Sequence, residues 1–188
     1  MSRWEPNARG RLEQAALELY VERGFDQTPV AEIAKRAGLT ERTFYRHYAD
    51  KREVLFGDGT TLPTLLANAV IETPDSIAPI DAVAGALEHW GELIQERRAG
   101  ALRRQVIIDA NAELRERELT KLATITLAMA GALRERGVQE PTASLAAEAG
   151  IVVLKVAYAR WISATGSPDL PQMIRESFRE LKSVTAGE

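Results

Sequence analysis

The chain contains no cysteine, few aromatic residues and no long uninterrupted apolar run. The missing cysteines exclude disulfides, zinc–thiolate sites and iron–sulfur clusters. Aromatic residues make up 6% of the 188 residues, whereas Ala, Leu, Glu and Arg are abundant, so the composition favours helices. The apolar runs 122–133 and 149–154 are shorter than the roughly 20 residues that span a membrane. We therefore expect a helical protein that does not contact a membrane.

Sequence motifs of the common enzyme classes are also absent. Neither His47 nor His89 lies three residues after a glutamate, so the paired Glu-x-x-His motif of di-iron bundles is missing. There is no phosphate-binding or dinucleotide-binding glycine loop and no nucleophile elbow. We expect no enzymatic activity, no cofactor and no metal site. The first residues contain no apolar stretch of the secretory kind, so we expect a cytoplasmic protein.

The charged residues are nearly balanced, with 24 Lys and Arg against 27 Asp and Glu and a net charge of −3. This balance argues against indiscriminate binding of nucleic acid. The charge is unevenly placed, since residues 1–56 carry a net +1 and residues 57–188 a net −4. The N-terminal part is therefore the segment best suited to approach phosphate.

The N-terminal part predicts three short helices. Apolar residues recur at helical spacing over 9–23. A second helix is predicted to begin at Pro29, because proline is tolerated in the first turn, and to end at Gly38. Thr28 is its expected N-cap. Thr40 predicts the cap of a third helix. Seven further helical stretches are expected, near residues 51–56, 65–71, 80–97, 99–111, 113–136, 141–165 and 171–184. The first of them is interrupted by Gly57, Gly59 and Pro63, and about nine helices are expected in the whole chain.

Residues 30–48, VAEIAKRAGLTERTFYRHY, have the spacing of a helix-turn-helix unit. Two helices that cross closely need a small residue, a glycine that reverses the chain and an apolar inner face, which Ala34, Gly38 and Phe44 supply. An ordinary corner between two helices is the alternative. The net charge of +2 over 41–52 favours DNA binding, in which the second helix lies in the major groove.

The stretch from Arg9 to Phe56 resembles the DNA-binding domain of TetR-family transcriptional regulators. The matching segments are ALELYVERGFDQT, VAEIAKRAG, LTERTFYRHYADK and EVLF. The resemblance implies an all-α fold, with a three-helix DNA-binding domain over 1–50 and a larger helical bundle for ligand binding and dimerisation over 51–188. It also implies a ligand-responsive repressor that binds a pseudo-palindromic double-stranded DNA operator as a homodimer.

The resemblance assigns roles to individual residues. Thr28 would bind phosphate, Thr40 would cap the recognition helix beside the DNA backbone, and Lys51 would meet phosphate. Four residues would face bases: Glu41, Arg42, Thr43 and Arg46. Three would lie at phosphate or sugar, the last of them partly in the core: Tyr45, His47 and Tyr48.

The chemistry of the base-facing residues agrees with these roles. Arginine pairs with guanine, glutamate accepts from cytosine, and a threonine methyl group contacts thymine. Each residue also has a simpler interpretation. Tyr45 can be a surface aromatic, Arg42 and Arg46 can solvate a helix face, and Glu41 can stabilise the helix dipole.

The predicted helix 141–165 is apolar on more than one side. Such a helix must be buried on two sides, and a partner molecule can cover one of them. The alternative is the core helix of a monomer. The resemblance implies that this helix and the one at 171–184 form a four-helix bundle between two copies.

The middle helices would hold an effector, if the resemblance extends to them. Seven residues are candidates for its lining: His89, Trp90, Ile94, Asp109, Met129, Tyr158 and Trp161. Each can instead be an ordinary core or surface residue. We expect a small, mainly apolar effector, such as a fatty-acyl compound, that swings the helix beginning near Lys51 and separates the two DNA-binding heads. A DNA-binding dimer without an effector, or a helical adaptor, is the alternative.

Overall fold

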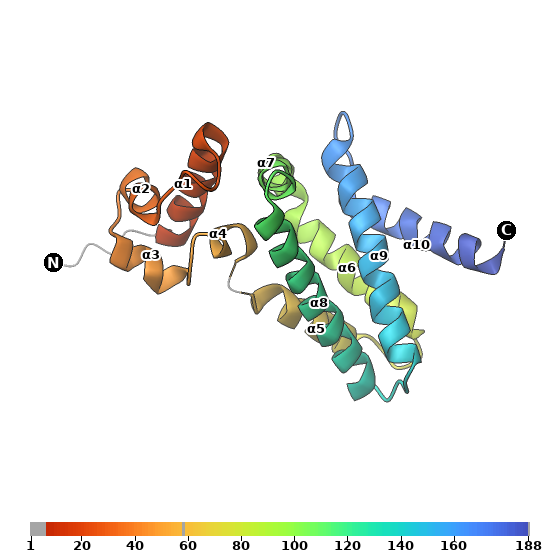
Figure 1. The fold of residues 1–188 in the computed structure, drawn as a ribbon. Helices are drawn as coiled ribbons and strands as arrows, with labels where there is room; N and C mark the ends of the chain where they lie inside the picture. The colour runs from red at the N-terminus through yellow and green to blue at the C-terminus, as the bar shows by residue number, and fades with distance from the viewer. Residues whose placement is uncertain (1–6, 58, 188) are drawn as a thin grey trace. The chain divides into compact units, whose positions relative to one another are not determined.

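The computed structural model describes residues 7–57 and 59–187, which contain ten α-helices, one short 3-10 helix and no strand (Figure 1). The all-α prediction is confirmed, and each stretch predicted to be helical overlaps one of these α-helices. The elements are α1 (Ala8–Arg23), α2 (Val30–Arg36), α3 (Glu41–His47), α4 (Glu53–Phe56), α5 (Thr61–Glu72), α6 (Pro79–Ile94), η1 (Gln95–Arg97), α7 (Arg98–Asp109), α8 (Ala112–Glu135), α9 (Thr142–Ser163) and α10 (Leu170–Ala186).

The helices form two compact units. Unit 1 comprises residues up to 59 together with 103–118, and unit 2 comprises 60–102 and the chain from 119 onward. The first unit therefore extends beyond the predicted domain boundary between residues 50 and 51 and includes a second segment, 103–118. The reason is that the end of α7 and the start of α8 contribute apolar side chains to the core of unit 1. The assignment of DNA binding and ligand binding to the two parts stays a prediction.

The core of unit 1 joins α1 to α4 with the corner between α7 and α8. From the first three helices, Leu12, Ile33 and Phe44 are completely buried. Ile108 and Leu114 of the corner are also completely buried and belong to the same cluster. The short helices of this unit therefore depend on residues that follow much later in the chain.

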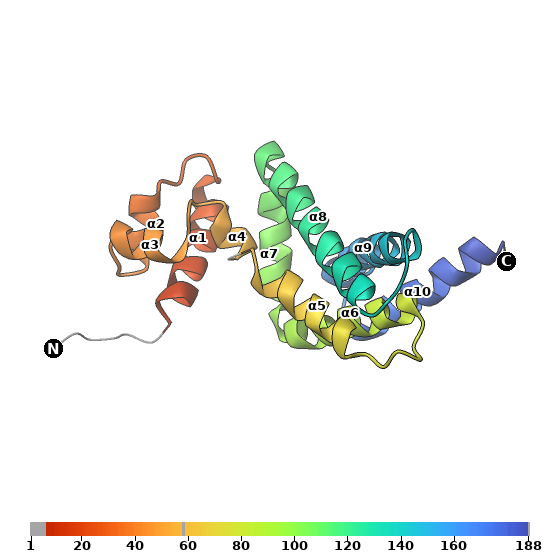
Figure 2. The ribbon, with the colours of Figure 1, turned by 90° about the horizontal axis from the view of Figure 1, so that it is seen from below.

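In unit 2, α6 packs against α5, α9 and α10, and Figure 2 shows α5 and α6 side by side. α9 buries residues along its whole length. At its C-terminal end, the guanidinium of Arg98 donates hydrogen bonds to the carbonyls of Trp161 at 2.8 Å and Ile162 at 3.3 Å. The side chain of Gln95 donates to the carbonyl of Pro168 at 2.7 Å and accepts from the amide of Leu170 at 2.9 Å. These contacts satisfy backbone groups that a helix end leaves unpaired and hold the α9–α10 loop.

Two stretches, 53–72 and 142–163, are long and apolar enough by length and composition to cross a membrane. They were not predicted from the sequence, because only uninterrupted apolar runs were considered there, whereas these stretches are apolar on average and contain polar residues. Composition alone is weak support for a membrane span, since the core helix of a globular protein has the same character. The second stretch is α9, and the first is divided between α4 and α5 around Gly57, whose φ is +73°.

A close approach of α6 and α9 depends on Gly150. A Cβ atom at this position would lie 2.4 Å from Cγ1 of Val83 and 3.5 Å from Cδ1 of Leu87. Overpacking of this kind costs about 1–3 kcal/mol. We expect Gly150→Ala to lower the free energy of unfolding by that amount in a denaturant titration.

Gly85 provides the matched control, because it is an exposed residue of α6 with no atom within 4 Å of a built Cβ. Alanine is the better helix former, so Gly85→Ala should be neutral or should stabilise the protein by up to about 1 kcal/mol. Equal unfolding free energies for the two variants would contradict the close approach.

Candidate nucleic-acid interface

α3 is a seven-residue helix with a buried inner side and an exposed outer side. The hydroxyl of Thr40 accepts a hydrogen bond from the amide of Thr43 at 3.2 Å, which confirms the predicted cap. Phe44 is completely buried, and its ring lies 5.5 Å from that of Tyr48, measured between centroids. The predicted base-facing residues divide by exposure, since Thr43 is half-buried and three are exposed: Glu41, Arg42 and Arg46. Tyr45 is 56% exposed.

The arginines of α3 differ from those of α1 and α2 in their partners. Arg36 pairs with Glu22 at 2.9 Å, which lowers the pKa of that carboxyl group, and Arg23 pairs with Glu32. Arg42 and Arg46 form no ion pair or hydrogen bond with any residue that the structure describes. Their positive charges are therefore free to meet an anion outside the molecule, such as a DNA phosphate, or a base edge.

Thr28 and Tyr48 are buried, with exposed fractions of 1% and 3%. The Thr28 hydroxyl donates to the carbonyl of Gly24 at 2.8 Å, and the Tyr48 hydroxyl donates to the carbonyl of Arg9 at 3.5 Å. Thr28 does not cap α2, whose N-cap is Pro29. The hydroxyl of Thr28 is therefore directed into unit 1, and its contact with phosphate stays a prediction. Tyr48 has the core position that was predicted in part.

Lys51 connects the α1–α2 loop to the start of α4. Its ammonium group donates to the carbonyls of Phe25 at 2.8 Å, Thr28 at 3.2 Å and Asp26 at 3.3 Å. Its own carbonyl accepts from the hydroxyl of Tyr20 at 2.7 Å, and burial raises the pKa of that phenol. An ammonium group has three N–H donors, so none is left for a phosphate in this arrangement. The predicted phosphate contact and the observed contacts are therefore alternatives.

His47 lies in a positively charged environment at the end of α3. Its Nε2 atom is buried and has no hydrogen-bond partner among the described residues. Burial lowers the pKa of the imidazole, and the nearby charges of Arg46 and Arg9 lower it further. The free protein therefore holds His47 neutral at pH 7, and a phosphate placed beside it would favour the protonated form.

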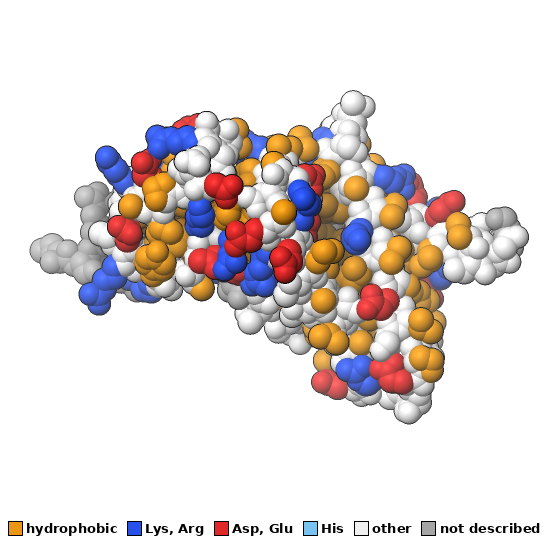
Figure 3. Space-filling view, in the orientation of Figure 1, with side chains coloured by type: hydrophobic (Ala, Val, Ile, Leu, Met, Phe, Trp, Pro, Cys, Tyr) orange, Lys and Arg blue, Asp and Glu red, His pale blue; other side chains and the backbone are white. Residues whose placement is uncertain are grey.

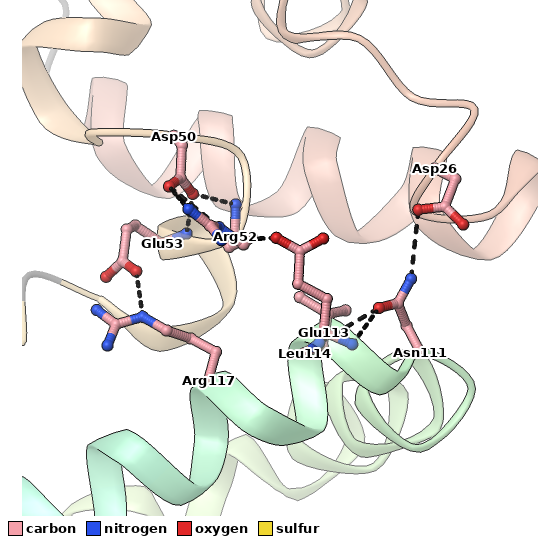
Figure 4. Close-up of polar contacts among 8 residues, drawn as sticks. All are labelled: Asp26, Asp50, Arg52, Glu53, Asn111, Glu113, Leu114 and Arg117. Atoms are coloured by element: carbon pink, nitrogen blue, oxygen red, sulfur yellow. Dashed lines mark hydrogen bonds and ion pairs between the residues drawn. The ribbon is translucent and has the colours of Figure 1, made fainter.

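The corner between α7 and α8 holds α4 through ion pairs (Figure 4). Arg52 donates to Asp50 at 2.6 Å and to Glu113 at 2.6 Å, and its hydrogen bonds lower the pKa of Asp50. Arg117 of α8 donates to Glu53 of α4 at 2.6 Å. The short helix that follows the predicted recognition helix is therefore held by charged groups from α8.

Further contacts from the same corner were not predicted from the sequence. Arg104 donates to the carbonyl of Leu55 at 2.7 Å and lies over the ring of Phe56, 5.0 Å from its centroid. Asn111 donates to Asp26 at 3.3 Å (Figure 4) and caps α8 by accepting from the amide of Glu113 at 3.0 Å. A cap residue after an apolar pair was visible in the sequence, but its partner 85 residues earlier was not.

The predicted effector residues do not form one group. Met129 and Trp161 are completely buried in unit 2, and Trp90 and Ile94 pack partly buried against the same core. The centroid of the Tyr158 ring lies 6.2 Å from that of Trp90 and 5.7 Å from that of Trp161.

Two of the predicted effector residues lie elsewhere. His89 is exposed, contacts Glu92 at 3.5 Å and lines an open surface pocket of about 590 Å³ formed by α5 and α6. Asp109 is exposed and belongs to unit 1, where it accepts from Gln105 at 2.9 Å. The last turn of α7 thus belongs to a different compact unit from the remaining candidates, and the role of Asp109 stays a prediction.

The contacts of Lys51 lead to a test of its two possible roles. Lys51→Met keeps the apolar stem and removes the three donors, so unfolding should become easier by about 1–3 kcal/mol. The slope of DNA affinity against salt concentration should stay unchanged. A phosphate contact predicts the reverse, a slope reduced by about one and no loss of stability. Lys35→Met on exposed α2 is the control and should change stability by less than about 0.5 kcal/mol.

The lowered pKa of His47 predicts a pH dependence of DNA binding. A nearby phosphate raises the pKa in the complex, so the complex takes up a proton that the free protein does not bind. Affinity should therefore increase as the pH falls from about 7.5 to 5.5, by roughly three- to tenfold. Fluorescence anisotropy with labelled DNA measures this change. His47→Gln should lose it and His89→Gln should keep it, and an increase that survives His47→Gln would contradict the assignment.

Comparison with known proteins identifies the N-terminal unit. Residues 13–56 match the family model of bacterial regulatory proteins of the tetR family. The HTH-type transcriptional regulator TcmR of Streptomyces glaucescens is 33% identical over 78 residues, which cover 42% of this chain and 34% of TcmR. The uncharacterised HTH-type transcriptional regulator YvdT of Bacillus subtilis is 30% identical over 67 residues, covering 36% and 31%. The chain thus matches about a third of the length of these two relatives.

Solved structures extend the likeness of the fold to nearly the whole chain. The repressor FadR of Thermus thermophilus, a TetR-family protein solved with lauroyl-CoA, is 24% identical with a TM-score of 0.57 and 93% coverage of both chains. FadR of Bacillus subtilis, solved with stearoyl-CoA, is 20% identical with a TM-score of 0.59, covering 92% of this chain and 96% of that one. Residues 13–56 thus match the tetR family of bacterial regulatory proteins, and the chain as a whole shares the all-helical fold of these solved structures.

Proposed function

We propose that the protein is a DNA-binding transcriptional regulator, a repressor that binds its operator as a homodimer in the cytoplasm and releases it when a small, mainly apolar ligand binds. The observation that carries the proposal is the outer side of α3. It presents Arg42 and Arg46, exposed and without partners among the described residues, on a helix held by the buried Phe44 and capped by Thr40. The tetR-family match over 13–56 covers this helix.

Base recognition in this proposal comes from one short helix. Arg42 and Arg46 would pair with guanine, and Glu41 would accept from cytosine. Tyr45 and His47 would contact the sugar–phosphate backbone, which sets the register without reading sequence. Two of the residues predicted to contact DNA would instead stabilise the α1–α2 loop: the buried Thr28 and Lys51, whose ammonium group donates to three backbone carbonyls.

A homodimer supplies the contacts that one head lacks. A single recognition helix reaches too few bases to select a site, whereas two related by a two-fold axis read a pseudo-palindrome. α9 and α10 offer the surface for pairing, and Figure 3 shows hydrophobic atoms along α9. Leu145, Val152 and Val156 on α9 are exposed by 64%, 54% and 50%, and Val184 on α10 by 66%. Exposed apolar rows of this kind mark interaction sites.

The ligand would enter the helical core of unit 2. Support comes from the apolar and aromatic side chains there, among them Met129, Tyr158 and Trp161. Two proteins of the same fold were solved with acyl-CoA molecules, lauroyl-CoA and stearoyl-CoA. A mainly apolar molecule is therefore the first ligand class to test.

Release of DNA would follow from differential binding. A ligand shifts an equilibrium only if it binds one state better than the other, here a state in which the two heads no longer match the operator. α4 is a short helix held by Arg104 of α7 and Arg117 of α8, and both of these helices continue into unit 2. We propose that these two helices carry the change to α4, which begins shortly after Lys51.

Operator binding tests the regulator. With the DNA upstream of its own gene, the purified protein should bind specifically, and Arg42→Ala should lose about 1–3 kcal/mol of affinity and tolerate substitution at one base position in each half-site. Arg36→Ala is the control, because Arg36 pairs with Glu22 on the protein itself and should change neither. Equal loss by Arg42→Ala on operator and random DNA would overturn the assignment of Arg42 as a base reader. Absence of any specific complex would overturn the proposed function.

A further inference from the structure

The core of unit 2 contains a polar group without a partner. Trp161 of α9 is completely buried, and its indole N–H has no acceptor among the residues that the structure describes. An indole can only donate a hydrogen bond, so no other arrangement of its own atoms satisfies it. Because a buried donor without an acceptor is unfavourable, its presence in a packed core calls for an explanation.

The surroundings of Trp161 are aromatic and partly accessible. Tyr158, one turn earlier on α9, has its ring centroid 5.7 Å from that of Trp161, with the ring planes at 48°. Trp90 of α6 lies 6.2 Å from Tyr158, with the planes at 30°. Trp90 and Tyr158 are half-buried whereas Trp161 is fully enclosed. The three rings therefore run from the partly exposed side of the core to its interior.

Arg98 is a second hydrogen-bond donor near Trp161, but its nitrogens already donate to backbone carbonyls. The carbonyl of Trp161 accepts from Arg98 Nε at 2.8 Å, and the other nitrogens of Arg98 donate to the carbonyls of Ile162 in the last turn of α9 and Gly166 in the α9–α10 loop. Arg98 is thus engaged with the backbone.

We infer that Trp161 is the hydrogen-bonding residue of an effector site, and that the effector is a flat, mainly apolar molecule with an oxygen acceptor such as a carbonyl group. This inference rests on the proposed function. Movement of Trp90 and Tyr158 admits the molecule, their rings stack on its faces, and the indole N–H of Trp161 donates to its oxygen. The interior is closed without ligand, so binding selects an opened state, as release of DNA requires.

The test uses two probes of matched size and shape on the full-length protein. 1-Acetonaphthone carries a carbonyl acceptor, and 1-ethylnaphthalene replaces that acceptor by a methylene group. The ketone should bind at least about tenfold more tightly, the difference that one buried hydrogen bond makes. In Trp161→Phe, which keeps an aromatic ring and removes the N–H, the two probes should bind within about twofold of each other.

A second measurement does not depend on the folding of that variant. The chain has three tryptophans, at 4, 90 and 161, whose indole N–H signals are resolved by NMR with labelled tryptophan. Trp4→Phe and Trp90→Phe assign the signals without changing Trp161. The ketone should shift the Trp161 signal toward that of a hydrogen-bonded indole, and the hydrocarbon should not.

Several outcomes would overturn the inference. They are equal affinities for the two probes in the wild type, a preference for the ketone that survives Trp161→Phe, a Trp161 signal that is already hydrogen-bonded without ligand because a water molecule occupies the site, and no binding of either probe. The proposed function is judged separately, with lauroyl-CoA. If lauroyl-CoA releases operator DNA equally from the wild type and from Trp161→Phe, the ligand-responsive repressor stands and the role of Trp161 fails.

Discussion

Helices of four to seven residues are not stable in water on their own, because the first turn costs more conformational entropy than its hydrogen bonds return. The helix-turn-helix segment consists of such helices, α2, α3 and α4. Their formation depends on burying apolar side chains in one shared core, to which α3 contributes the completely buried Phe44. The same burial sets which side of α3 faces outward. The chemistry of the proposed interface thus depends on an apolar contact that touches no DNA.

That core is completed by a segment that follows about fifty residues later. Ile107, Ile108 and Leu114 belong to it, and ion pairs of Glu113 and Arg117 hold the start of α4 from the same corner. α7 and α8 each take part in both compact units. The elements that complete unit 1 are therefore the ones that continue into unit 2.

Partners, rather than residue type, decide which charges of unit 1 are available. Arg36 and Arg52 are paired with carboxylates, and the ammonium group of Lys51 is surrounded by backbone carbonyls. Arg42 and Arg46 have no such partner in the described part of the chain. This explains how a protein of net charge −3 can present a locally positive surface. In unit 2 the unpartnered group is a donor, the indole of Trp161, and it lies in the interior.

Local signals in the sequence determined the all-α class, the Thr40 cap, the end of α1 at Gly24 and the inward direction of Phe44. Each depends on residues within one or two helical turns, where spacing and backbone preference suffice. Tertiary structure alone decided the burial of Thr28, the carbonyl contacts of Lys51, the placement of 103–118 in the first unit and the separation of Asp109 from the other effector candidates. Most of these outcomes involve contacts between residues far apart in the sequence, such as Lys51 with Thr28 and Asp26 with Asn111, 23 and 85 positions apart. Helical periodicity carries no information about such pairs, because it fixes which face of a helix is apolar but not which distant segment covers that face.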